Sequence, residues 1–341
     1  MTATIPEAGG FLPHHHFWSA DSFALERERI FRRCWLYMGV FDGADELSAT
    51  MAGLRFTVHR DIGSPEGGSP EGGDPTGAGR PAGNLSGFCH DDTGARPLDV
   101  DRCGALVFAR VAQAGGPTLA EHLAPYGGQL AAMSTNCVHP EPPAAVPFQA
   151  NWKGMVENTL DDFHGSTVHP QTIHPTVHPD WQTHLATGRH GANSDSSWRL
   201  ADGAIGWWMK LDARLTLARF AGEACYRHLF IFPNFYLASF YGAVVIPHRV
   251  DPVAPDAAVL RWQLFLPTTR LETARARAFH RSTAAYLAAS ATAVIEEDRP
   301  ICEAVQQGRP GALGNGAYGR RERRLLDFHA AVAAHLAKGD P

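Results

Sequence analysis

The pattern of apolar and polar positions predicts one helix and then strands in the first third of the chain. Apolar side chains recur at roughly helical spacing over residues 22–35, and Asp21 or Ser22 can cap this helix. Residues 54–60 alternate and carry enough β-branched side chains for a strand, and residues 103–111 have the pattern of a buried strand. We therefore expect a β-rich region after the first helix.

Beyond a proline-rich linker, the pattern predicts longer helices and a second set of strands. Helical spacing covers residues 151–168, one or two long helices cover 271–307, and an amphipathic helix covers 325–338. Four further runs have strand character: 205–211, 226–232, 235–246 and 259–265. The predicted fold class is α+β, with a small β-rich domain followed by a larger domain whose sheet packs against helices.

Composition separates the parts of the chain more sharply than the hydrophobic pattern does. Between residues 63 and 84, 12 of 22 residues are Gly or Pro, and a Gly-Ser-Pro-Glu-Gly-Gly unit nearly repeats. Such a segment cannot sustain a ladder or a helix, so we expect a mobile insert. We divide the chain into an N-terminal segment (1–45), a small β-rich domain that carries the insert (46–125) and a larger domain (126–341).

Charge and composition exclude several classes of protein. The 341 residues are 44% hydrophobic and carry a formal net charge of −5, with no basic run interleaved with aromatic residues, which disfavours nucleic acid as a partner. No run approaches the length of a membrane span, and the first ten residues lack the pattern of a secretory signal. The six scattered cysteines fit free thiols in a reducing compartment, so we expect a cytoplasmic protein.

Two histidines five residues apart are the first sign of chemistry. On an unbroken helix, His164 and His169 would lie roughly 140° apart, so they converge on one ion only if the helix opens between them. Gly165 and the β-branched Thr167 favour such an opening. Two imidazoles with one carboxylate are typical of mononuclear non-haem iron.

Spacing alone is a weak signal, because the chain contains 18 histidines. His174 and His178, each followed by proline, compete with the first pair. We expect these two to lie in a turn-rich surface loop.

The residues around the first pair make the signal specific. The motifs Asn151-Trp152-Lys153, Glu157-Asn158, Asp161-x-x-His164 and His169 stand in one register. They resemble the catalytic segment of Rieske non-haem iron oxygenase alpha subunits, the aromatic ring-hydroxylating dioxygenase family. A second motif of that family, E-D-x-x-x-x-E-x-x-Q, matches residues 297–306. The opening helix, the strand over 103–111 and residues 232–234 are also similar.

The resemblance implies an iron(II) site with His164, His169 and Asp298 as ligands. It implies that the Asp161 side chain hydrogen-bonds the first ligand and fixes its tautomer. Independently of the resemblance, we expect the neighbouring Asp162 to lie on a helix surface. Asn158 is expected to point towards the open side of the metal. The resemblance also implies a helix-grip-like catalytic domain, to which residues 1–45 contribute, and an oligomer, with a trimer favoured.

The substrate pocket is expected to be apolar and aromatic. Trp207, Phe235 and Phe240 are the leading candidates for substrate binding, from a wider set with Trp208, Met209, Tyr236 and Tyr241. Each is also a plausible core residue. These side chains suit a flat ring or a cationic amine equally well.

The chain departs from the family in its N-terminal half. The family binds a [2Fe–2S] cluster through C-x-H and C-x-x-H about sixteen residues apart. Cys89 and His90 are adjacent, and Cys103 has no histidine three positions later. The only such motifs, Cys137-Val138-His139 and Cys225-Tyr226-Arg227-His228, are over eighty residues apart. We therefore expect no iron–sulfur ligands and no cluster, and we regard residues 46–125 as a degenerate Rieske-like domain.

A missing cluster leaves three interpretations of function. The first is an iron(II)-dependent oxygenase that hydroxylates or oxidatively demethylates a small organic substrate. Its electrons then come from a separate ferredoxin, reductase or cluster-bearing subunit. The second is an iron enzyme whose substrate supplies the electrons, giving oxidative cleavage or rearrangement. The third is a non-catalytic subunit that assembles with a cluster-bearing homologue.

Overall fold

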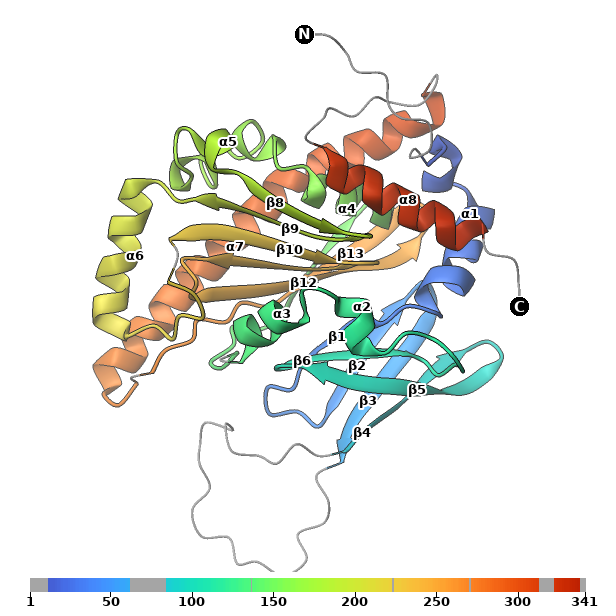
Figure 1. Ribbon diagram of the computed structural model, residues 1–341, viewed down its shortest axis with the longest axis horizontal. Coiled ribbons are helices and arrows are strands. Elements are labelled where there is room, and N and C mark those ends of the chain that lie inside the picture. The colour runs from blue at the N-terminus through green and yellow to red at the C-terminus, as the bar shows by residue number, and fades with distance from the viewer. Residues whose placement is uncertain are drawn as a thin grey trace, which may run out of the picture.

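Two antiparallel sheets form the framework, and helices cover the larger one (Figure 1). The computed structural model describes residues 12–61, 84–135, 137–222, 224–269, 271–312 and 322–337. The smaller sheet has the order β1-β6-β5-β4-β3-β2 and the larger has the order β7-β13-β12-β11-β10-β9-β8. The architecture has the predicted α+β class.

The smaller sheet begins earlier in the chain than the pattern predicts. Its strands are β1 (Leu36–Val40), β2 (Glu46–Met51), β3 (Leu54–Asp61), β4 (Asn84–Asp91), β5 (Gly94–Cys103) and β6 (Leu106–Val111). Strand β1 pairs with β6, so part of the segment 1–45 belongs to this sheet. The predicted insert over 63–84 lies outside the described residues except for Asn84, which starts β4.

The larger sheet is built mainly from hairpins. Its strands are β7 (Ala144–Phe148), β8 (Ala186–His190), β9 (Asn193–Arg199), β10 (Cys225–Ile231), β11 (Phe235–Phe240), β12 (Val244–Ala254) and β13 (Ala257–Trp262). The predicted run 235–246 divides into two strands at Tyr241 and Gly242, whose φ angles are 59° and 64°. Positive φ at both positions suits a tight hairpin turn. A side chain at Gly242 would meet the Ala221 carbonyl oxygen at 2.3 Å.

Both faces of the larger sheet are buried, which explains its nearly continuous apolar runs. Along β10, Phe230 belongs to the cluster beneath the helices, whereas Leu229 and Ile231 pack on the opposite face. That opposite face meets the smaller sheet through Tyr37 and Phe108. The helix-covered face is therefore the one that can hold a site.

The helices are α1 (Ala20–Glu26), α2 (Leu119–Leu123), α3 (Gly127–Ser134), α4 (Trp152–Leu160), α5 (Trp181–His184), α6 (Asp202–Leu215), α7 (Ala274–Gly308) and α8 (Arg323–Ala337). Helix α4 contacts α7, α8 and β12. The long helix α7 runs across the larger sheet (Figure 1). Helices from distant parts of the sequence thus meet over one face of the sheet.

Three further predicted elements differ from the structure. The run 205–211 was predicted as a strand and is wrong, because it lies inside α6. The helix predicted over 22–35 ends earlier, since α1 passes into the π-helical turn η2 (Arg27–Phe31) before β1 starts. The helix predicted over 151–168 ends at Leu160.

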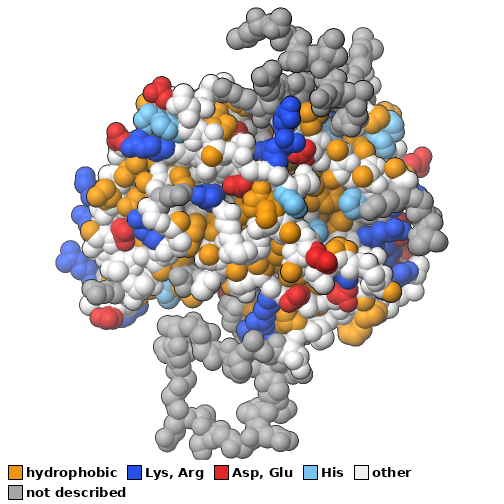
Figure 2. All heavy atoms as spheres, in the orientation of Figure 1, with side chains coloured by type: hydrophobic (Ala, Val, Ile, Leu, Met, Phe, Trp, Pro, Cys, Tyr) orange, Lys and Arg blue, Asp and Glu red, His pale blue; other side chains and the backbone are white. Residues whose placement is uncertain are grey.

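The face drawn in Figure 2 carries charged side chains of both signs. On the face drawn in Figure 2, basic side chains are interspersed with acidic ones and form no continuous band. In the described part of the chain, none of the helices combines the length and apolar character needed to cross a bilayer.

Candidate metal centre

Helix α4 ends before the two histidines, so the angle that helical spacing gives does not apply to them. The Asn151 side chain caps the start of α4 by accepting from the Lys153 N–H at 2.9 Å. At the other end, Asp161 adopts an extended conformation (φ −79°, ψ 107°), so the chain leaves the helix. His164 then starts the short turn η3 (His164–Ser166), and His169 follows from the next turn. The α-helix therefore ends before the first histidine, and the residues between the two histidines do not continue it.

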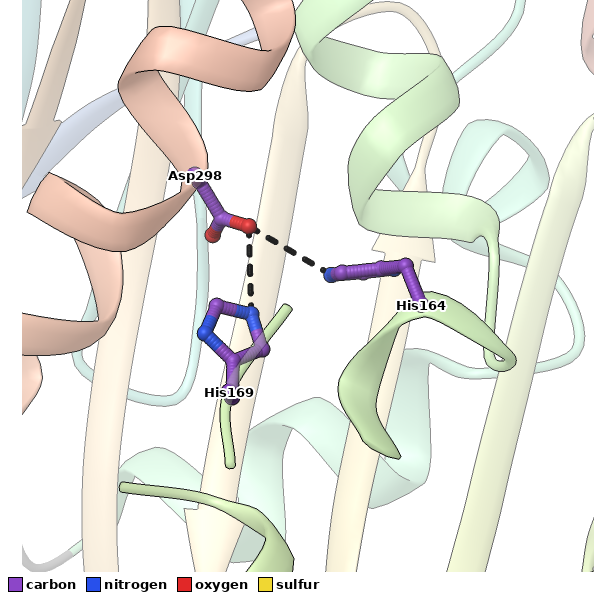
Figure 3. A group of neighbouring side chains, drawn as sticks. All are labelled: His164, His169 and Asp298. Atoms are coloured by element: carbon purple, nitrogen blue, oxygen red, sulfur yellow. Dashed lines mark ion pairs between the residues drawn. The ribbon is translucent and has the colours of Figure 1, made fainter. Parts of the chain in front are cut away.

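Helix α7 brings a carboxylate to both imidazoles (Figure 3). Asp298 Oδ1 lies 3.5 Å from Nε2 of His164 and 3.1 Å from Nε2 of His169. The candidate ligand atoms all lie within 4.8 Å of one another. Within the described ranges, this is the only group of three or more His, Cys, Asp or Glu residues so arranged.

Hydrogen bonds on the far side of each ring fix its orientation. Nδ1 of His164 donates to the backbone carbonyl oxygen of Asp161 at 2.6 Å. Nδ1 of His169 donates to Glu297 Oε2 at 2.7 Å, and the same oxygen accepts from Thr172 at 2.6 Å. A neutral ring that donates through Nδ1 keeps a lone pair on Nε2. Both lone pairs therefore face the shared carboxylate.

This arrangement fits a metal ion. Nε2 of His169 and Oδ1 of Asp298 are buried, and neither has a hydrogen-bond partner among the described residues. Two lone-pair atoms at this separation repel each other unless a cation lies between them. Donor atoms that share one ion at roughly 2 Å each lie about 3 Å apart. Two imidazoles and one carboxylate, with other positions left open, suit iron(II).

The same proximity shifts the pKa of all three groups. Burial opposes the charge on Asp298, yet the two imidazoles hold the pKa of this carboxyl at about 2. Burial would lower the pKa of His164 and His169, but the carboxylate outweighs burial and raises the pKa of both rings. Protons therefore compete with a metal for these nitrogens.

A cavity of about 130 Å³ opens onto the three side chains. Its walls come from α4, α7 and strands β9 to β12. In another protein, a cavity of about 150 Å³ holds one benzene ring. The cavity thus has the size for one small organic molecule beside the candidate ligands.

Comparison with known families agrees with this geometry. The family model described as "Ring hydroxylating alpha subunit (catalytic domain)" matches residues 134–338, which is more than half of the chain. The chain belongs to this family. It is therefore an O2-dependent oxidoreductase, and the predicted family and enzyme class are confirmed.

Solved structures of other oxygenases share the fold. A quaternary ammonium Rieske monooxygenase, described in connection with carnitine oxidation by gut microbiota, has a TM-score of 0.70 at 14% identity, covering 96% of this chain and 95% of that chain. Naphthalene 1,2-dioxygenase from Rhodococcus sp. has a TM-score of 0.65 at 16% identity, with the same coverage. No curated protein matches the chain.

These findings confirm the predicted fold class and set the chemistry of the family. Ring-hydroxylating alpha subunits use one non-haem iron(II) at the catalytic site. They act on small molecules with O2, work with external electron partners and form oligomers.

The two residues predicted to support the iron site, Asp161 and Asn158, lie differently with respect to it. Asp161 contacts His164 through its backbone carbonyl, while its carboxylate Oδ2 lies 3.9 Å from Nδ1. The carboxylate accepts instead from the Phe163 N–H at 2.8 Å, so the predicted side-chain role is wrong. Asn158 lines the cavity, on the side where it was expected.

Of the three predicted substrate-binding residues, the structure places one at the cavity. Phe240 lines the cavity wall. Trp207 is 41% exposed on α6, and Phe235 lies on the opposite face of the sheet against Tyr37. The predicted roles of Trp207 and Phe235 are therefore wrong, because the first lies on a helix and the second points away from the site.

The competing histidines lie near the surface. His174 is exposed in the turn η4 (His174–Thr176), and the His178 ring contacts the His184 ring with centroids 4.9 Å apart. Neither belongs to the group of candidate ligands.

Several residues around the cavity escaped the sequence analysis. Asp162 does not lie on a helix surface: its side chain is only 6% exposed, and its two oxygens lie 3.1 and 3.2 Å from Nη1 of Arg324. The same guanidinium donates to His228, a cavity residue. Glu297 was recognised only as part of a motif. Both Asp162 and Glu297 stand next to a predicted site residue in the sequence, which could have marked them as candidates. No local pattern, however, connects Asp162 with Arg324 or Glu297 with His169.

Within the described residues, Cys89, His90 and Cys103 do not belong to a group of candidate metal ligands. Cys89 is fully buried in β4, and alternation directs His90 to the other face. The Cys103 thiol donates to the Gly127 carbonyl oxygen at 3.1 Å. Burial raises the pKa of both thiols, which disfavours the thiolate form that metals bind.

Proposed function

We infer that this chain is a mononuclear iron(II) oxygenase in which His164, His169 and Asp298 hold the metal. The observation that carries the inference is the buried pair of facing lone pairs on His169 and Asp298, which lack hydrogen-bond partners in the described structure. Membership of the ring-hydroxylating family supports iron(II) as the ion.

The chemistry that bound iron(II) supplies is the reductive activation of O2. Hydroxylation consumes O2, a C–H bond, two electrons and two protons, and it yields a hydroxyl group and water. The protein's own residues position the ligands: the Asp161 carbonyl and the Glu297 carboxylate hold the two rings. The cavity walls exclude bulk water and place a small substrate beside the ligands.

The two electrons are proposed to come from a separate ferredoxin, reductase or cluster-bearing subunit. The domain 46–125 lacks the two paired Cys and His motifs, and residues 62–83 contain neither residue type. We propose that 46–125 is a degenerate Rieske-like domain, that 126–341 forms the catalytic domain together with 1–45, and that the chain forms an oligomer. A trimer of this chain and an assembly with a cluster-bearing subunit both fit this proposal.

The test is oxygen uptake by iron-loaded protein with NADH, a ferredoxin reductase and a ferredoxin. A panel of single-ring aromatic compounds and L-carnitine serves as substrates. We expect uptake coupled to a hydroxylated or demethylated product, and we expect it to stop when the ferredoxin is omitted. Uptake with iron(II) and substrate alone would instead show that the substrate supplies the electrons. No uptake under any condition would favour a non-catalytic subunit.

A further inference from the structure

His228 stands in the middle of β10 and faces the cavity that holds the candidate iron ligands. It is 4% exposed. Its Nδ1 lies 2.8 Å from Nη2 of Arg324. A guanidinium can only donate, so Nδ1 accepts and the ring proton lies on Nε2. Burial, and then the charge of Arg324, lower the pKa of His228 well below its usual value, so the ring is neutral.

Arg324, the hydrogen-bond partner of His228, is fixed by further hydrogen bonds. Arg324 is 2% exposed, and its guanidinium also bonds Oγ of Ser194 at 3.1 Å and Oγ of Ser196 at 3.0 Å. Asp162 lies against the guanidinium with both oxygens and neutralises its charge. His228, which lines the cavity, is therefore a neutral N–H donor with one defined tautomer.

The Nε2–H donor of His228 has no acceptor among the described residues. Nε2 of His228 is buried and has no hydrogen-bond partner among the described residues. A buried donor left unpaired is unfavourable, and native structures rarely retain one without a reason. Its position at the cavity wall indicates that a bound molecule completes the pair.

The neighbouring wall is aromatic. Trp198 and Tyr226 stack with ring centroids 4.3 Å apart, and Phe240 meets Tyr226 at 4.8 Å. All three line the cavity with His228. The wall suits the face of a flat ring, while the N–H donor requires an oxygen acceptor and disfavours a cation at the same point.

We propose that His228 determines specificity by donating from Nε2 to a carbonyl or carboxylate oxygen of a single-ring aromatic substrate. The ring lies against Trp198 and Tyr226, with the reacting carbon towards the iron ligands. This inference rests on the proposed function for its meaning, but binding of the oxygen acceptor needs no turnover.

The test compares two probes that differ only at the acceptor: acetophenone, with a C=O group, and α-methylstyrene, with C=CH2 in its place. Affinities are measured by calorimetry without oxygen, on iron-loaded wild-type protein. We expect acetophenone to bind at least about tenfold more tightly, because a site built around a donor rejects the analogue that leaves it unpaired. In His228→Phe this ratio should fall to about one, whereas His228→Gln, which keeps an N–H donor, should retain part of it.

The matched control is His248→Phe, a second cavity histidine with a buried Nδ1 that has no hydrogen-bond partner in the described structure. It should leave the ratio unchanged. A merely structural role of His228 would weaken both probes equally. Equal affinities in the wild type, an unchanged ratio in His228→Phe, or a ratio lost only in His248→Phe would overturn the proposal. If His228→Phe does not fold, His228→Leu, which also lacks an N–H donor, takes its place, and an unchanged ratio in that variant would overturn the proposal.

Iron content measured on the same samples separates this inference from the proposed function. If wild-type protein retains no iron after loading but still selects acetophenone, the metal assignment is wrong and the role of His228 is supported. Iron-loaded protein without selectivity would defeat the role of His228 alone.

Discussion

Asp298→Ala should leave a folded protein that no longer retains iron. Asp298 is the single carboxylate between the two imidazoles, 3.1 and 3.5 Å from their Nε2 atoms. Residues that only orient a metal ligand already contribute roughly 10- to 100-fold to metal affinity, so loss of a ligand should exceed that range. We expect iron, measured by metal analysis after purification without oxygen, to fall from one per chain to near zero, and oxygen uptake to fall to background.

Glu296→Ala is the control for this variant. Glu296 precedes Asp298 by two residues on α7, but its side chain is 41% exposed and pairs with the equally exposed Arg299. It should keep full iron and activity. A circular dichroism spectrum and a melting curve establish that Asp298→Ala is folded. Full retention of iron in folded Asp298→Ala would contradict the ligand assignment.

Lys153→Met should destabilise the protein by about 3–5 kcal/mol, because it leaves a buried carboxylate without its cation. The side chains of Lys153 and Glu26 are both fully buried and form an ion pair. Glu26 also accepts from the Trp152 indole N–H at 2.7 Å, so the pair joins α1 to α4. A loss of this size is a large share of the roughly 5–15 kcal/mol that stabilises a typical protein. Urea unfolding gives the free energy of unfolding directly.

Two further variants show whether the loss of stability in Lys153→Met comes from the unpaired Glu26 carboxylate. Lys210→Met removes an exposed lysine on α6 and should change the free energy of unfolding by less than about 0.5 kcal/mol. Lys153→Met combined with Glu26→Gln removes both charges and should recover much of the loss. A single Lys153→Met variant as stable as Lys210→Met would show that the buried pair contributes nothing to stability.

Periodicity of apolar residues predicted an element correctly where the repeat extends over the whole predicted range. The strand predicted over 54–60 is β3, and the long helix predicted over 271–307 is α7. The error at 205–211 came from a window that was too short. Trp208, Leu211 and Leu215 are buried along α6 at helical spacing, but only two of them fall inside that run.

The candidate ligands could be named from the sequence because motif resemblance supplied what spacing could not. Spacing left His164 and His169 on different sides of a helix, but α4 ends at Leu160 and His164 starts the separate short turn η3, so helical spacing does not apply to the pair. The surrounding contacts could not be predicted in the same way. Glu297 meets His169 across 128 positions and Arg324 meets His228 across 96, so both pairs depend on the packing of α7 and α8.

The substrate residues show the same limit. Trp207, Phe235 and Phe240 are all aromatic residues in apolar runs, and the sequence offers no means of ranking them. The sheet decides between Phe235 and Phe240, because five positions apart on one strand they face opposite sides. Only Phe240 faces the cavity.

Metal analysis together with the absorption spectrum, on wild-type protein purified without oxygen, tests the central claim most directly. We expect one iron per chain and no visible charge-transfer bands, because the metal is bound by nitrogen and oxygen ligands alone. Three irons per chain with a red-brown colour would show that a [2Fe–2S] cluster is present beside the mononuclear site. That result would contradict the proposal that this chain depends on a separate source of electrons.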